Sequence, residues 1–209
     1  MNYSLYIMLV VAYLLGSLSF AIIVSKFMKM DDPRSYGSHN AGATNVMRSG
    51  NKKAAAFTLL GDLVKGLLVV LIARFLMRGI EGGEAIVGIC GILVVIGHIY
   101  PIFFKFKGGK GVATAVGVLL GFNAWLALLL VATWVVVFKT TKISSLAAIL
   151  ACLLAPVFAY VLFGNTSYFG ATLIISIFVI FKHRSNIMRL VKGQESNFKK
   201  DAANDDTAN

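Results

Sequence analysis

Long apolar blocks, separated by short and mostly basic polar loops, constrain the fold of this sequence more than any other feature. The first block runs from Met1 to Val24, and further blocks recur as far as Phe181. One membrane-spanning helix needs about 20 mostly apolar residues, whereas the core of a soluble domain does not need continuous apolar runs. We therefore expect an all-α integral membrane protein.

The composition agrees with a membrane protein. Charged residues make up 14% of the chain, whereas a soluble domain is about a quarter charged. No basic segment precedes the first block and no small-residue cleavage site follows it, so it is expected to be a retained helix. Cys90 and Cys152 lie inside apolar blocks without C-x-x-C spacing. Both are expected to be small buried apolar residues.

The pattern predicts seven helical transmembrane segments. Their expected ranges are Ser4–Met28, Ala54–Met77, Ala85–Phe104, a pair at about 112–120 and 123–138, Ile143–Phe163 and Tyr168–Phe181. Residues 1–200 are expected to form a single membrane-embedded domain. Residues 201–209 are polar and acidic, and are expected to form a disordered tail.

The distribution of basic residues predicts the orientation of these segments. The net charge of +11 is concentrated in segments 29–53, 105–111 and 139–142 and in the stretch after Phe181. Because basic loops stay on the cytoplasmic side, these four segments are expected inside, with the N-terminus outside and the C-terminus cytoplasmic. The basic residues lie beside membrane spans, where they meet lipid head groups, so nucleic-acid binding is excluded.

The same rule predicts a fold-back between Val112 and Phe138. A single crossing would place the basic segments 105–111 and 139–142 on opposite sides of the membrane. As one helix this block would measure about 40 Å, which exceeds the roughly 30 Å hydrocarbon core. Gly121-Phe-Asn123 is the expected break, giving a short fold-back helix pair at about 112–138.

Three polar segments carry the candidate chemistry, and the first is YGSHNAGATNVMRSG at 36–50. Its small residues let the backbone turn and approach a ligand. Hydroxyl, amide and guanidinium groups suit a phosphate or a polyol, and here they belong to Ser38, Asn40, Thr44, Asn45 and Arg48. The alternative is a solvated loop with helix-capping residues.

The second segment is KFKGGKGVAT at 105–114, in which Gly108, Gly109 and Gly111 surround Lys110. Backbone N–H groups at a helix N-terminus favour an anion, and Thr114 follows one turn into the expected helix. The Walker A spacing is absent, because Gly111 follows the lysine where Ser or Thr is required. We therefore expect a phosphate site without a nucleotide; the alternative is a flexible basic loop.

The third segment is KHRSNIMRLVKG at 182–193. If it is helical, His183 and Asn186 share one face because they are three residues apart. The alternative is a basic stretch that touches lipid head groups.

Ionisable residues also lie within the apolar blocks, at Asp62, Lys65 and His98. Such groups are costly in a membrane and usually face an interior or a pathway. Asp62 and Lys65 either support the site or pair with each other. His98 is either a hydrogen-bonded structural histidine or a proton carrier. The histidines have no metal-ligand spacing, so no metal is expected, and the absence of a Ser/His/Asp triad suits a reaction whose nucleophile belongs to a substrate.

Taken together and in order, the motifs GSHNAGATNVMR, GDLVKG, GHIYP with KGGKGVAT, and HRSNI resemble the bacterial acyl-phosphate:glycerol-3-phosphate acyltransferases. The resemblance runs from the first helix to about Glu195. His39 and Ala41 stand where the family often has glycine and a larger aliphatic residue, which affects loop packing and leaves the polar set unchanged.

The resemblance implies an enzyme that transfers an acyl group from acyl phosphate to the 1-hydroxyl of glycerol 3-phosphate. The products would be 1-acyl-glycerol 3-phosphate (lysophosphatidate) and inorganic phosphate, in the first step of bacterial phospholipid synthesis. It also implies a location in the cytoplasmic (inner) membrane with the active site on the cytoplasmic side, membrane lipids as surroundings, and no cofactor, metal or nucleotide. A monomer is the expected state.

Functional roles implied by the resemblance fall on Ser38, Arg48, Lys110, His183 and Asn186. We expect Arg48 to bind one phosphate and the Gly108–Gly111 loop with Lys110 to bind the other. Ser38, His183 and Asn186 would orient the glycerol and share the proton or oxyanion work.

The competing hypotheses are a membrane transporter or flippase for a phosphorylated metabolite and a channel or structural membrane protein. Transporter sites lie near the bilayer midplane, whereas these motifs gather at one side.

Overall fold

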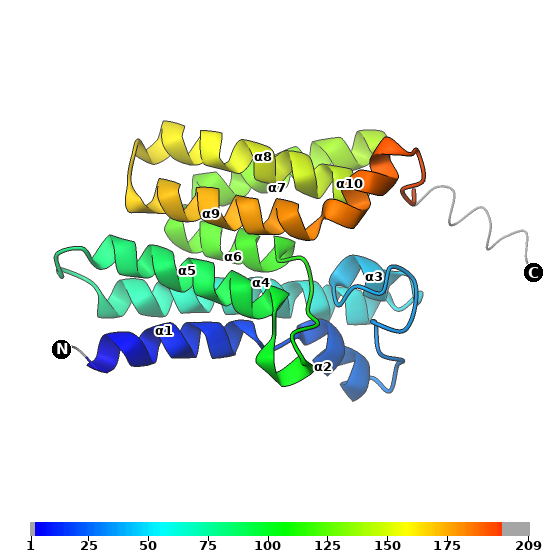
Figure 1. Cartoon of the computed structure of the whole chain (residues 1–209), viewed down its shortest axis with the longest axis horizontal. Helices are drawn as coiled ribbons and strands as arrows, with labels where there is room; N and C mark the ends of the chain where they lie inside the picture. The colour runs from blue at the N-terminus through cyan, green and yellow to red at the C-terminus, as the bar shows by residue number, and fades with distance from the viewer. Residues whose placement is uncertain (1–2, 198–209) are drawn as a thin grey trace, which may run out of the picture.

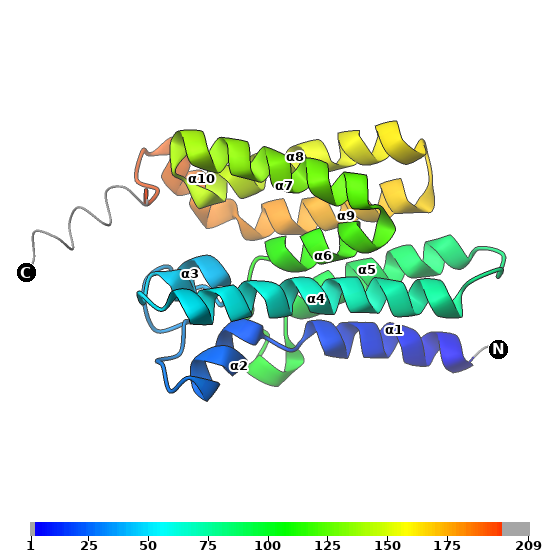
Figure 2. The ribbon, with the colours of Figure 1, turned by 180° about the vertical axis from the view of Figure 1, so that it is seen from behind.

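The computed structural model of the chain describes residues 3–197, and every regular element in that range is helical. The long helices lie side by side in one bundle (Figure 1, Figure 2). The elements are α1 Tyr3–Gly16, α2 Phe20–Phe27, α3 Ala43–Met47, α4 Lys52–Leu76, α5 Gly83–Ile99, the 3-10 turn η1 Ile102–Phe104, α6 Val112–Phe122, α7 Ala124–Thr141, α8 Ser144–Phe163, α9 Ser167–Lys182 and α10 Arg184–Val191. The predicted all-α class is confirmed for these residues, and the predicted tail at 201–209 lies outside them.

The helices have the length and apolar character of membrane spans. Within the described residues, four are long and apolar enough to cross a membrane alone: α4, α5 with its extension to Phe104, α7 and α8. The pairs α1–α2 and α9–α10 are bent by 50° and 59°, and counting each pair as one span gives six. Large apolar side chains cover the outside, including Phe75 and Val161, each 78% exposed. Such a surface suits lipid and not water.

The predicted continuous helix over Ser4–Met28 is wrong, because the chain breaks between α1 and α2. At the break, Ser17 Oγ donates back to Tyr13 O over 2.9 Å, and Lys65 Nζ in α4 donates to Leu18 O over 2.6 Å. A carbonyl that loses its helical partner inside a bundle needs another donor. The lysine of a neighbouring helix supplies it, and no local pattern in the first block shows this.

The predicted break at Gly121–Asn123 is confirmed. Asn123 caps α7 by accepting hydrogen bonds from the N–H groups of Trp125 and Leu126, at 2.7 and 3.3 Å. Arg74 Nη1 in α4 donates to Gly121 O over 2.7 Å, which places a cation at the negative end of α6. Helix α7 then runs back towards the end of the bundle that holds α10 (Figure 2).

Helices α4 and α6 touch backbone to backbone through glycine. A Cβ placed on Gly66 would lie 2.4 Å from Thr114 O, and one on Gly117 would lie 1.9 Å from Leu63 O. Small residues allow this closeness between helices that share an apolar surrounding. Because α6 packs along α4 from Leu63 onwards, the loop before α6 is recessed into the bundle.

We predict that Gly117→Ala destabilises the protein by about 1–3 kcal/mol, because the added methyl group would press on an immobile helix backbone. The measurement is thermal unfolding in detergent. Gly170→Ala in α9 is the matched control, because a Cβ there meets nothing within 4 Å. The control should be as stable as the parent or up to about 1 kcal/mol more stable; equal melting temperatures for the two variants would contradict the close α4–α6 contact.

Candidate active site

The three predicted polar segments meet at one end of the bundle, around two adjoining cavities of about 690 and 800 Å³. These volumes lie in the usual range of ligand sites. The inner cavity is the smaller one and extends among the helices, whereas the outer cavity is lined mainly by loops. Their shared boundary is formed by Ser38, His39, Asn40, Lys110 and Arg189.

The inner cavity has a polar end and an apolar end. Side chains from α4, α6, α7 and α8 line the apolar end, among them Leu63, Val116, Leu130, Trp134 and Ala148. Hydrogen-bonding and charged side chains line the polar end, among them Ser38, Arg48, Lys110, His183, Asn186 and Glu195. One cavity of this kind can hold a molecule with a charged head and an apolar chain.

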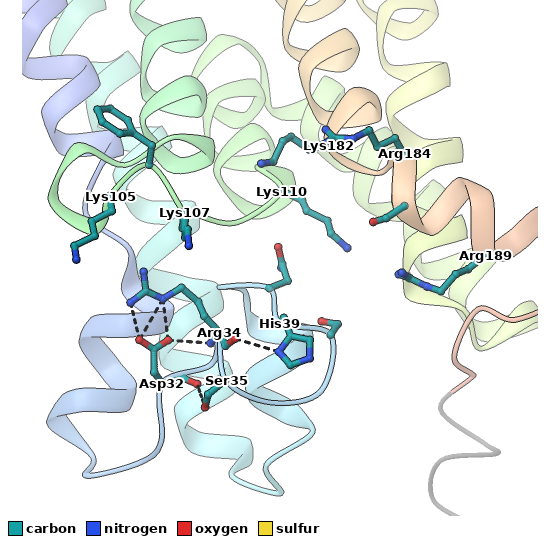
Figure 3. Close-up of a pocket in the computed structure, with 15 residues that line it drawn as sticks. Asp32, Arg34, Ser35, His39, Lys105, Lys107, Lys110, Lys182, Arg184 and Arg189 are labelled. Carbon is teal, nitrogen blue, oxygen red and sulfur yellow. Dashed lines mark hydrogen bonds and ion pairs between the residues drawn. The ribbon is translucent and has the colours of Figure 1, made fainter.

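The outer cavity is strongly basic. Figure 3 shows cationic side chains that reach it from three segments of the chain: Arg34, Lys105, Lys107, Lys110, Lys182, Arg184 and Arg189. Asp32 is its one carboxylate among the described residues, and Arg34 pairs with it at 2.6 Å. The hydrogen bond from Arg34 lowers the pKa of Asp32, so this carboxylate stays ionised. The excess positive charge favours small anions that approach from water.

The glycine loop is shaped by His98 of α5. Gly109 N donates to His98 O over 3.2 Å, so that N–H is not available to a ligand. A Cβ on Gly108 would lie 2.1 Å from His98 O, and one on Gly109 would lie 2.2 Å from His98 Nε2. These two glycines are therefore required by packing, and the N–H groups at the start of α6, after Gly111, are suited to an anion.

Lys110 lies between both cavities, and its ammonium group donates to Asn186 Oδ1 over 2.6 Å. Burial lowers the pKa of Lys110 to about 8, because the charged form loses water. Asn186 is itself fixed, since its Nδ2 donates to Glu195 Oε1 over 2.5 Å. The amide therefore aims the ammonium group into the site.

Glu195 is a site residue that the sequence did not predict. Its carboxylate accepts hydrogen bonds from Ser145 Oγ and Arg189 Nε, each at 2.7 Å, as well as from Asn186. Burial would raise the pKa of Glu195, but these donors bring it below the ordinary value. Glu195 follows α10 in a short polar stretch, and no pattern separates that stretch from a solvated tail. Next to it, Ser196 Oγ is hydrogen-bonded to the Arg48 guanidinium.

Asn45 holds the first motif in shape. Its Oδ1 accepts from Ser38 N at 2.8 Å, and its Nδ2 donates to Pro33 O at 2.6 Å and to Tyr36 O at 3.2 Å. The residue is 1% exposed. Asn45 therefore positions Ser38 at the cavity wall, a structural use that the sequence left open beside ligand binding.

His183 is placed at the corner between α9 and α10, where it lines the inner cavity. Its Nδ1 lies 2.8 Å from Val179 O. A carbonyl only accepts hydrogen bonds, so Nδ1 carries the proton and Nε2 is the acceptor. His183 can therefore receive a hydrogen bond from a substrate hydroxyl.

The ionisable residues of the apolar blocks form one buried cluster. Lys65 Nζ lies 2.8 Å from Asp62 Oδ1, and His98 Nδ1 lies 3.3 Å from the same oxygen. The pairing of Asp62 with Lys65, which the sequence left open beside a site-supporting role, is present in the structure. Asp62 and His98 also line the inner cavity, so this cluster reaches the site.

Most of the predicted site residues come together. The inner cavity is lined by Ser38, Asn40, Thr44, Asn45, Asp62, Arg48, His98, Lys110, Gly111, His183 and Asn186. Gly108 lines the outer cavity, whereas Gly109 and Lys65 lie behind the wall. Thr114 is fully buried and lines neither cavity, because its turn of α6 packs on Gly66. Within residues 3–197, no three His, Cys, Asp or Glu side chains are grouped as metal ligands.

Comparison with known proteins agrees with this geometry. A model of the glycerol-3-phosphate acyltransferase family matches residues 6–193. This chain belongs to the glycerol-3-phosphate acyltransferase family. The glycerol-3-phosphate acyltransferase of Chromobacterium violaceum is 57% identical over 185 residues, covering 88% of this chain and 90% of that protein. The relative from Coxiella burnetii is 50% identical over 194 residues, covering 92% and 97%.

Solved structures show the same fold. A crystal structure of PlsY (YgiH), described as an integral membrane glycerol 3-phosphate acyltransferase in its glycerol 3-phosphate form, matches with a TM-score of 0.87 and 37% identity. The match covers 93% of this chain and 96% of that one. The lysophosphatidic acid form matches with a TM-score of 0.85 and 36% identity. The predicted family and the membrane character are thus confirmed.

Proposed function

We propose that this protein transfers an acyl group from acyl phosphate to the 1-hydroxyl of glycerol 3-phosphate, giving lysophosphatidate and inorganic phosphate. The observation that carries the proposal is the inner cavity, whose cationic, hydrogen-bonding end continues into an apolar end between α4, α6, α7 and α8. Two molecules of this reaction carry an acyl chain, namely acyl phosphate and lysophosphatidate. Each has a phosphate-containing head and an apolar chain. The related structures with glycerol 3-phosphate and lysophosphatidic acid are named for a substrate and a product of the same reaction.

The reaction needs positioning and charge neutralisation more than it needs a protein nucleophile. The 1-hydroxyl oxygen attacks the acyl carbonyl carbon, and the bond between that carbon and the phosphate oxygen breaks. The electron pair leaves with phosphate, and the hydroxyl proton passes to His183 Nε2 or to the departing phosphate. Orienting the two reactants supplies a large part of such a rate enhancement.

The position of each site residue in the inner cavity indicates whether it binds phosphate or orients the attacking hydroxyl. Arg48 and Lys110 lie on the polar wall, each within reach of a phosphate group, and the start of α6 adds backbone N–H donors. Ser38 and His183 orient the attacking hydroxyl, while Asn186 directs Lys110 and is held by Glu195. Asn40 and Thr44 complete the wall beside Ser38.

The predicted topology and location are part of the proposal. Residues 1–200 form one membrane-embedded domain in the bacterial inner membrane, with seven crossings, the N-terminus outside and the site facing the cytoplasm. In support, the turn between α7 and α8 lies at the site end, since Thr44 Oγ1 is 3.4 Å from Ser144 Oγ. The expected monomer is part of the same proposal.

The direct test is acyl transfer by purified protein in detergent, with acyl phosphate and labelled glycerol 3-phosphate. An acyltransferase forms labelled lysophosphatidate without a sealed membrane, whereas a transporter forms none.

Arg48→Ala and Lys110→Ala should each lower kcat/KM by about tenfold or more, because each removes a charge-assisted contact to phosphate. Lys139→Ala, an exposed cation in α7, is the control and should retain activity. Near-normal rates in both site variants would refute the assigned roles.

A second prediction concerns pH. The pKa of Lys110 is lowered to about 8, so the ammonium form is lost as the pH rises through that value. Affinity for the phosphate substrate should therefore fall above about pH 8, seen as a decline in kcat/KM, which reports groups of the free enzyme. In Lys110→Arg the charge persists to beyond pH 12, so the remaining activity should lack this decline. The same decline in both proteins would exclude Lys110 as its source.

A third prediction tests the sidedness. In a protein whose Cys90 and Cys152 are replaced by Ala, Lys142→Cys should react with an impermeant thiol reagent only after cells are opened. Asn165→Cys, in the turn between α8 and α9, should react in intact cells. Labelling of position 142 from outside would overturn the fold-back topology.

A further inference from the structure

Helix α10 has its polar face turned inwards and its apolar face turned outwards. Asn186 is 3% exposed and donates to Glu195, and Arg189 borders both cavities and binds the same carboxylate. On the opposite side of the helix, Met188 is 61% exposed and Val191 is 85% exposed. A helix beside water buries its apolar residues and exposes its polar ones. The reversed arrangement indicates that the outer side of α10 faces an apolar surrounding.

A cation stands at each end of this outer side. Exposed residues at helical spacing form an outward stripe, which consists of Arg184, Met188, Val191 and Lys192. The Arg184 guanidinium lies 5.0 Å from the centre of the Phe181 ring at the end of α9, and Phe181 is 55% exposed. The stripe therefore continues the apolar outer surface of the bundle. Apolar residues flanked by cations are typical of a helix that lies in the head-group layer of a membrane.

The bend between α9 and α10 keeps α10 near the membrane boundary. Lys182 Nζ lies 4.7 Å from the centre of the Tyr100 ring, and basic and aromatic side chains together mark the membrane–water interface. Helix α10 begins two residues later, at 59° to α9. With α9 along the membrane normal, the 8 residues of α10 measure about 12 Å and rise only about 6 Å above that level. The head-group layer is about 5–7 Å thick on each side, so α10 stays within it.

We propose that α10 is an interfacial helix, whose outward stripe binds the head-group layer of the membrane at the site end of the bundle. The apolar residues of the stripe dip towards the acyl chains, and its two cations bind anionic phospholipid head groups. Asn186 lies on the same short helix and accepts a hydrogen bond from Lys110, so lipid that fixes α10 also fixes this ammonium group in the site. This effect on catalysis rests on the proposed function, whereas the binding of lipid does not.

Collisions of a spin label test this placement without any activity readout. The full chain, with both native cysteines replaced by alanine, carries one label in nanodiscs, at Met188→Cys or at Val191→Cys. Each label should collide more often with oxygen, which dissolves in lipid, than with a water-soluble nickel chelate. Val161→Cys on the exposed apolar side of α8 is the lipid control, and Ser185→Cys at the outer cavity is the water control. The ratio of oxygen to nickel collisions should exceed that of the water control several-fold.

Two results of the labelling would overturn the proposal. A label at position 191 with the collision ratio of the water control would mean that the stripe faces water. A label at that position shielded from both reagents would mean that protein covers the stripe. The melting temperature of each labelled protein, compared with that of the cysteine-free parent, shows whether the variant is folded.

The charge of the head groups gives a second readout. Acyl transfer is measured in phosphatidylcholine nanodiscs with and without phosphatidylglycerol, an anionic lipid. Anionic lipid should favour kcat/KM of the parent over that of Lys192→Gln by about two- to fivefold, as expected for one basic residue at an anionic surface. Lys139→Gln, which removes an exposed cation of α7, is the control and should respond like the parent. Equal responses of the two variants would refute the binding of anionic head groups by α10.

The outcomes separate this inference from the proposed function. Wild-type protein that makes no lysophosphatidate would refute the proposed function, and the collision ratios would still decide where α10 lies. Active protein whose label at position 191 faces water would refute only the interfacial helix. A failure of the cysteine variants to fold leaves the lipid response of Lys192→Gln to decide.

Discussion

The ammonium group of Lys65 connects three helices of this structure and the loop that follows one of them. It satisfies the carbonyl freed by the break between α1 and α2, neutralises Asp62 within α4, and binds the imidazole of His98 at the end of α5. The backbone of His98 then holds the glycine loop through Gly109. Because a cation without partners is costly in this surrounding, these contacts depend on one another. The bend of the first span and the shape of the site thus have a common origin.

The recessed position of the site follows from how α6 is held. Between helices in an apolar surrounding, close approach of backbones and buried polar contacts replace the hydrophobic effect as the source of association. Gly66 and Gly117 permit that approach between α4 and α6, and Arg74 binds the carbonyl groups at the far end of α6. At about 1.5 Å per residue, the 11 residues of α6 measure about 16 Å. A helix of this length starts well inside the bundle, and the anion-binding end of the helix starts there with it.

The sequence predicted features that depend on composition and charge, and missed those that depend on distant partners. The helix pair around Asn123 followed from the basic segments on either side of it. The break after Gly16 did not, because its cause is a lysine nearly fifty residues later, and Leu18 and Phe20 read as continuous apolar helix. Glu195 was missed because its donors come from α8 and α10. The sequence offered Asn45, Gly108 and Gly109 as candidate ligand groups. In the structure Asn45 positions Ser38, and the two glycines allow close packing on His98, which no sequence pattern indicates.

The two-ended inner cavity has a consequence for how such an enzyme meets its substrates. Glycerol 3-phosphate is soluble and would arrive through the basic outer cavity, at a rate that depends on its concentration in water and on ionic strength. A long acyl chain belongs to the bilayer, and the apolar end of the cavity lies among the helices that face it. The relevant quantity for that substrate is its mole fraction in the membrane. Diluting the membrane with inert lipid would then slow turnover at constant bulk concentration, so the protein couples a three-dimensional supply of one substrate to a two-dimensional supply of the other.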